Sequence, residues 1–177
     1  MSAMGVAISL LSATETAMHV EELGALLHAC VHDGASIGFV LPFSATESES
    51  YWRSKVLPRV QDGVVILLLA RREGRIVGSV QLDHDTPPNQ PHRAEVRKLL
   101  VHPECRRQGI AKALMFAIES RAAALGRSLL TLDTRTGDDA EPLYTKLGYS
   151  TAGIIPGYCR DPFEDRLDPT TVMYKAL

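Results

Sequence analysis

Apolar residues along the N-terminal part of the chain follow first a strand and then a helical spacing. Residues 6–11 form a short apolar run that predicts a first strand. The sequence Ser12-Ala13-Thr14-Glu15 then has the form of a capping box, which opens helices. Apolar positions recur every three or four residues until Gly34, so we predict a first helix over residues 16–33.

The middle of the chain predicts a loop, a second helix and a hairpin. Residues 34–44 form an apolar loop, and a second capping box at Ser44 begins a helix in which Pro58 lies near the end or causes a kink. Apolar, β-branched residues over 64–71 and 75–84 flank a glycine turn. This arrangement is typical of an antiparallel hairpin.

The C-terminal half alternates strands with helices. One predicted helix begins near Gln108 and closes at Gly126, and a shorter one covers residues 138–147. Strands are predicted over residues 94–101, 128–134, 149–153 and 171–177, with the remaining segments as loops. The order of elements predicts one α/β (α+β) domain, with a mixed, mostly antiparallel sheet of about seven strands flanked by about four helices.

Composition narrows the class of protein. The chain has 177 residues, of which 45% are apolar and 23% charged, and this length supports a single domain over residues 1–177. Its 19 basic and 21 acidic residues give a formal charge of -2, which argues against nucleic acid as a partner. No apolar run approaches the roughly 20 residues of a membrane helix, and no signal-peptide pattern is present. We therefore expect a soluble, cytoplasmic protein with no membrane partner.

Cysteines and histidines do not form a recognisable ligand pattern. Cys30, Cys105 and Cys159 are widely spaced and contain no C-x-x-C pair, so we expect neither a disulfide framework nor a zinc site. His28 and His32 lie four residues apart without the glutamate that follows the first histidine in the H-E-x-x-H pattern. No metal is expected.

Candidate chemistry lies where the strand over residues 94–101 turns into the next helix. The turn carries Arg106 and Arg107, and Gly109 opens the helix. Free backbone N–H groups at a helix N-terminus, a glycine that lets the backbone approach closely, and guanidinium groups together suit a phosphate. Any basic turn before a helix matches R-x-x-G-x-A, so a solvated helix cap remains the alternative for this motif alone.

Three motifs, taken in order, resemble the GNAT superfamily of acetyl-CoA-dependent N-acetyltransferases. Arg106-x-x-Gly109-x-Ala111 is similar to the family's pyrophosphate loop, residues 95–101 to its splayed fourth strand, and residues 140–149 to its last helix and following strand. The resemblance covers about residue 64 to the C-terminus and implies a GNAT-like fold with acetyl-CoA as co-substrate. The cofactor-binding residues that it implies are Leu99, Leu100, Val101, Arg106, Arg107, Gln108, Gly109, Ile110, Ala111 and Lys112.

A narrower resemblance, over nearly the whole chain, is to acetyltransferases that inactivate tabtoxin-type β-lactams. It is carried by residues 33–39, 93–99, 132–134 and 156–159. It implies a small amino-acid-like or antibiotic/toxin acceptor, and hence antibiotic resistance or toxin inactivation. Residues 34–39 and 156–159 are predicted loops, where selectivity is expected. We take Ser36, Phe39 and Tyr158 as candidate substrate-binding residues.

Acetyl transfer to an amine requires a neutral nitrogen, yet an alkyl amine with a pKa near 10.4 is about 99.9% protonated at pH 7. The resemblance implies Glu95 and Asp133 as candidate bases. As alternatives, Glu95 forms only an ion pair with Arg97, and Asp133 only caps the loop that follows it. Tyr144 is the candidate acid for the leaving thiol, with sulfur positioning or simple packing as its alternatives.

The predicted reaction is direct attack by the amine in a ternary complex, without an acyl-enzyme. Cys105 is the cysteine nearest to the motif region. Two other functions remain open: a non-catalytic acetyl-CoA sensor module, and an acetyltransferase for protein or peptide amines. Relatives of this fold often form homodimers, although the residues carry no interface signature. The acidic residues Asp161, Glu164 and Asp165 are expected in a mobile, solvated loop, with attraction of a cationic amine as the alternative.

Overall fold

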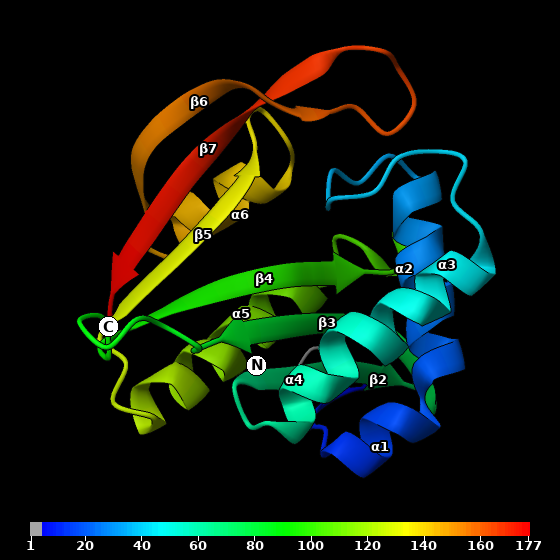
Figure 1. Cartoon of the computed structure of the whole chain (residues 1–177), viewed down its shortest axis with the longest axis horizontal. Coiled ribbons are helices and arrows are strands. Elements are labelled where there is room, and N and C mark those ends of the chain that lie inside the picture. The colour runs from blue at the N-terminus through cyan, green and yellow to red at the C-terminus, as the bar shows by residue number, and fades with distance from the viewer. Residues whose placement is uncertain (1–4) are drawn as a thin grey trace.

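The computed structural model describes residues 5–177, and its strands form a single sheet (Figure 1). The spatial order is β1-β2-β3-β4-β5-β7-β6, and every neighbouring pair is antiparallel except β4 and β5. The predicted mixed, mostly antiparallel seven-stranded sheet is therefore confirmed. The strands are β1 (Val6–Leu10), β2 (Val65–Arg72), β3 (Arg75–Asp83), β4 (Arg93–Val101), β5 (Leu129–Arg135), β6 (Ser150–Arg160) and β7 (Leu167–Ala176).

Helices cover both faces of this sheet because its central strands are apolar on both sides. In β2, Leu67 and Leu69 face one core with α2 and α3, while Leu68 and Ala70 face a second core with α5. Figure 1 shows α3 and α4 in front of the sheet and α5 behind it. The helices are α1 (Ala13–Met18), α2 (Val20–His32), α3 (Ala45–Tyr51), α4 (Leu57–Gln61), α5 (Ile110–Ala124) and α6 (Ala140–Lys146), with a π-helical turn at Trp52–Val56 and a 3-10 turn at Pro103–Cys105.

The N-terminal helical region differs from the single helix predicted over residues 16–33. Both capping boxes form, so α1 begins directly after Ser12 and α3 directly after Ser44. The first helix breaks at His19, whose non-helical backbone ends α1 and begins α2. Pro58 lies near the end of this helical region, as predicted: it occupies the first turn of α4, which follows the π-helical turn and ends at Gln61. Among residues 5–177, no helix combines the length and apolarity needed to cross a membrane.

The C-terminal hairpin is longer than predicted. Residues 156–159, predicted as a loop, lie within β6, where the pairing register with β7 shifts between Ile155 and Cys159. Pro156 is tolerated there because β6 is an edge strand and needs fewer ladder hydrogen bonds. The expected solvated loop around Asp161 is also corrected: this side chain is buried and ion-paired with Arg166 at 2.9 Å.

The central irregularity of the sheet is the separation of β4 from β5. Their parallel pairing covers only three positions, from Arg93–Leu129 to Glu95–Thr131, after which the strands diverge (Figure 1). Just beyond this point β4 carries a bulge, because Gln81 of β3 pairs with Arg97 while Ser79 pairs with Leu100. Lys98 lies in the bulge with a φ of 49°. The divergence leaves one edge of β4 without a strand partner within residues 5–177.

Candidate active site

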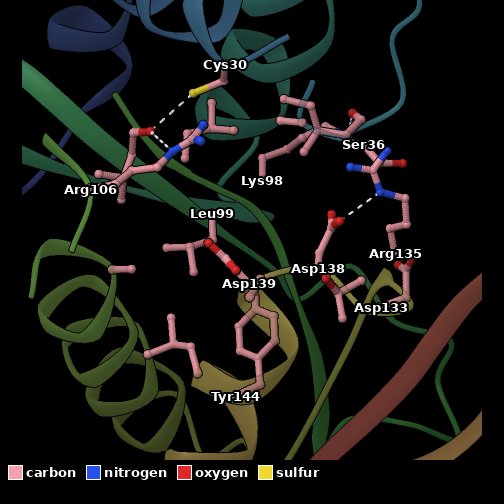
Figure 2. Close-up of a pocket in the computed structure, with 18 of the residues that line it drawn as sticks. Cys30, Ser36, Lys98, Leu99, Arg106, Asp133, Arg135, Asp138, Asp139 and Tyr144 are labelled. Carbon is pink, nitrogen blue, oxygen red and sulfur yellow. Dashed lines mark hydrogen bonds and ion pairs between the residues drawn. The ribbon is translucent and has the colours of Figure 1, made fainter. Parts of the chain in front are cut away.

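A cavity of about 960 Å³ opens where β4 and β5 separate. Its walls come from the loop after α2, the turn before α5, the start of α6 and the irregular part of β6. Figure 2 shows Leu99 and Tyr144 on one side of this space, with Ser36, Lys98 and Asp133 on the other. Parts of the chain that are far apart in the sequence therefore meet here.

The turn before α5 has the shape of an anion-binding cradle. Arg107 and Gly109 both have positive φ values, of 59° and 80°, and α5 begins at Ile110. A Cβ added to Gly109 would meet nothing within 4 Å, so the space next to its backbone is open. Free N–H groups at the start of a 15-residue helix face this space and favour negative charge. This geometry suits a phosphate group.

The polar side chains of this turn are already engaged. Arg106 donates from Nη1 to Asp33 Oδ2 at 2.5 Å, and from Nε to the Val101 carbonyl at 3.4 Å. Cys30 Sγ also donates to that carbonyl, at 3.5 Å (Figure 2). The remaining members of the predicted cofactor set line the cavity, with one exception: Gln108 accepts a hydrogen bond from Arg72 outside it. Arg107 pairs with Asp139 at 3.1 Å, and both side chains are exposed.

The two candidate bases lie on the strands that diverge, and both line the cavity. Glu95 is 39% exposed, and its Oε1 lies 3.9 Å from Arg97 Nε, so the ion pair considered as its alternative role is present. Asp133 Oδ2 accepts a hydrogen bond from Thr170 Oγ1 of β7 at 3.1 Å, which places it against a neighbouring strand. The assignment of either carboxylate as the base stays a prediction.

Tyr144 lies on α6 with its ring packed edge-on against Tyr149, at 5.8 Å between ring centroids. Its side chain is 6% exposed and lines the cavity. Burial, with a smaller contribution from the negative charge of Asp133, raises the pKa of the phenol above its usual value. The hydroxyl therefore stays protonated at neutral pH and is available as a donor.

Only two of the three candidate substrate-binding residues line the cavity. Ser36 and Tyr158 line the cavity, and Ser36 Oγ lies 3.4 Å from Cys159 Sγ. Phe39 does not line it, because its ring packs against Phe43 at 4.7 Å and against Tyr51 at 5.2 Å between centroids. Phe39 thus supports the wall of the site from behind.

Two cations at the site were missed by sequence reasoning. Arg135, at the end of β5, contacts Asp138 at 2.9 Å, Asp161 at 3.1 Å and the Gly34 carbonyl at 3.1 Å. Lys98 Nζ donates to the Ile37 carbonyl at 2.6 Å. The available signal was position: each follows a candidate carboxylate by two or three residues on the same strand.

Comparison with known proteins relates this chain to acetyltransferases. A model of the acetyltransferase (GNAT) family matches residues 38–149. An uncharacterized N-acetyltransferase from the hisH-hisA intergenic region of Azospirillum brasilense is 32% identical over 114 residues, which are 63% of this chain and 66% of that protein. An acetyltransferase of Pectobacterium atrosepticum is 37% identical over 91 residues, 51% of this chain and 61% of that protein. The chain thus spans less than two thirds of the length of these curated relatives.

Solved structures share the fold over nearly the whole chain. The ribosomal-protein-alanine N-acetyltransferase of Brucella melitensis has a TM-score of 0.77 at 20% identity, covering 97% of this chain and 99% of that one. The yncA protein of Salmonella typhimurium, solved with its cofactor acetyl-CoA, has a TM-score of 0.75 at 16% identity, covering 98% and 94%. At such low identity the likeness establishes the fold, and it confirms the architecture expected from the sequence.

Proposed function

The chain belongs to the acetyltransferase (GNAT) family, and from this membership we propose that it transfers the acetyl group of acetyl-CoA to the amine of a small amino-acid-like acceptor. One observation carries the proposal: a single cavity joins an anion-binding helix N-terminus to two carboxylates on diverging strands. A tabtoxin-type β-lactam is among the acceptors that we propose, which would make the protein a toxin-inactivating enzyme.

In this proposal, backbone groups bind the co-substrate. The N-terminus of α5 holds the pyrophosphate, and the unpaired edge of β4 around Leu99 and Val101 binds the pantetheine amides. Acetyl-CoA supplies the acetyl group as an activated thioester. Since the Val101 carbonyl already accepts from Arg106 and Cys30, that part of the edge must exchange partners on binding.

The proton steps use side chains from both diverging strands and from α6. Glu95, or Asp133 across the split, accepts the proton of the acceptor amine directly or through one water. The backbone N–H near Leu100 stabilises the charge that develops on the carbonyl oxygen. Tyr144 then donates its proton to the departing sulfur. Attack is direct, so no cysteine becomes acylated.

The acceptor side of the cavity is closed by contacts that favour a small acceptor over a protein tail. The Leu41 N–H donates to the Pro162 carbonyl at 3.0 Å, and Arg135 ties Gly34 to the same hairpin. A Cβ added to Gly34 would lie 2.9 Å from the Phe163 ring, so the two segments pack without a gap. A peptide would have to separate them.

The test is CoA release from acetyl-CoA over a panel of amino acids, dipeptides, polyamines, aminoglycosides and a tabtoxin-type β-lactam, with mass spectrometry of the products. Acetylation of one class of small, amino-acid-like amine would support the proposal. Dipeptides outcompeting free amino acids would instead indicate peptide or protein acceptors. Binding of acetyl-CoA without turnover of any amine, or of added protein, would favour the sensor function.

A further inference from the structure

Lys98 differs from every arginine that lines the cavity. Each of those arginines has a carboxylate within 4.0 Å, as Arg97 does with Asp83 at 3.0 Å and Arg135 with Asp138 at 2.9 Å. Lys98 is half-buried in the wall and has no carboxylate within that distance anywhere in residues 5–177. A cation removed from water without an anionic partner is costly, so it is either tolerated for structure or kept for a ligand.

The surroundings of Lys98 hold its ammonium group without neutralising it. Its Nζ donates to the Ile37 carbonyl at 2.6 Å and lies 5.7 Å and 6.0 Å from the ring centroids of Phe39 and Tyr51. An ammonium has three N–H donors, so two remain beyond this bond. The bulge of β4, where Lys98 has a φ of 49°, directs the side chain to this position.

Opposing influences also act on the pKa of Lys98. Burial, and next the positive charge of Arg97, lower its pKa to about 8, while Asp133 and Glu95 act in the opposite direction. These are the charged groups of β4 and β5 that act on it, and Tyr51 is the titratable group that faces it from α3. The ammonium form therefore dominates at pH 7 and is lost as the pH rises through 8.

Both signs of charge thus lie at the acceptor end of one cavity. Glu95 and Asp133 suit an amine, and Lys98 offers a cation that no protein carboxylate occupies. We propose that Lys98 binds the carboxylate of the acceptor, so that the enzyme selects zwitterionic amines over amines without an acid group. This inference rests on the proposed function, because it names the recognition element for that same acceptor.

The experiment compares acceptors that differ only in the acid group. The probes are α-amino acids, their carboxamides and the corresponding decarboxylated amines, measured as kcat/KM with the full-length wild type, Lys98→Met and Lys98→Arg. We expect the wild type to prefer the amino acids by at least tenfold, Lys98→Met to lose that preference, and Lys98→Arg to retain most of it because the charge remains. Lys55→Met, an exposed lysine outside the cavity, is the matched control and should behave as wild type.

A purely structural tether predicts a different pattern. If Lys98 only held the loop through Ile37, Lys98→Met would lower kcat/KM equally for all three acceptor types, and that result would overturn the proposal. A second readout is the pH profile with one amino acid: the ratio of wild-type to Lys98→Arg kcat/KM should fall about tenfold from pH 7 to pH 9, as the lysine deprotonates and the arginine does not. A flat ratio contradicts carboxylate binding by Lys98.

The wild type alone separates this inference from the proposed function. Turnover of small amines with no preference for the amino acids overturns the role of Lys98 and leaves the acetyltransferase function standing. No turnover of any small amine overturns both. Acetyl-CoA affinity, measured by calorimetry, should differ by less than about twofold between wild type and Lys98→Met, which excludes general misfolding as the cause of lost preference.

Discussion

Replacing Tyr144 by phenylalanine removes one hydroxyl from the cavity and keeps the ring. No protein hydrogen bond to that hydroxyl is present within residues 5–177, and the edge-on packing against Tyr149 does not depend on it. We therefore expect the free energy of unfolding to change by less than about 1 kcal/mol, which for a chain of this size corresponds to less than about 2–4 °C in Tm.

The expected effect on catalysis follows from the leaving group. A thiol has a pKa near 8.5, so its thiolate departs with modest help, and a positioned acid contributes less here than for an alkoxide or an amine. We expect kcat to fall about tenfold, or about 1.4 kcal/mol in the activation free energy, with KM for acetyl-CoA unchanged. Because burial keeps the pKa of Tyr144 above its usual value, this deficit should stay constant from pH 7 to pH 9.

The assay is steady-state CoA release with the acceptor identified from the panel, together with a thermal melt of each variant. Tyr149→Phe is the matched control, because Tyr149 is also a buried tyrosine and does not line the cavity. It should leave kcat within about twofold of wild type. If Tyr144→Phe also left kcat within that range, proton donation by Tyr144 would be refuted and packing would be its role.

Further outcomes test the other parts of the site. Gly109→Glu should abolish acetyl-CoA binding in calorimetry, since it adds bulk and negative charge at the proposed phosphate position; unchanged affinity would remove the turn before α5 from the binding site. Glu95→Gln should lower kcat about a hundredfold at unchanged acetyl-CoA affinity, and an unaltered rate would leave Asp133 as the candidate base. Cys105→Ala should keep full turnover, and loss of activity would argue against direct attack. Asp139→Asn frees Arg107 from an exposed pair, so the Kd for acetyl-CoA should improve by no more than about fivefold; a large loss would mean that Asp139 itself contacts the ligand.

Local signals predicted local structure well. The capping boxes at Ser12 and Ser44 and the hairpin around Gly74 depend on residues within a few positions of each other, so the sequence alone determines them. The break at His19 escaped prediction because no glycine or proline lies near it to mark the end of a helix. The extension of β6 to Arg160 escaped for a different reason: its pairing depends on β7, which the chain reaches only after a turn.

The motifs of the candidate site could be predicted from the sequence, but the ion pairs and hydrogen bonds of its charged side chains could not. The pyrophosphate-like turn and both carboxylates were located from spacing and resemblance, and they meet in one cavity. The engagement of Arg106 by Asp33 involves residues 73 positions apart, and that of Arg135 by Gly34 residues 101 positions apart. The sequence could not show that Lys98 lacks a carboxylate partner, because its distance from each carboxylate is set only when the chain folds.

In the proposed binding mode, the unpaired edge of β4 couples the stability of the protein to its co-substrate. A ligand that binds that edge only in the folded chain adds about 2.7 kcal/mol to the free energy of unfolding at a hundred times its Kd, or about 5–10 °C in Tm. Scarce acetyl-CoA would then leave more of the chain open to proteolysis, and plentiful acetyl-CoA would protect the fold. The amount of this protein in a cell would then rise and fall with the acetyl-CoA supply, without any dedicated regulatory domain.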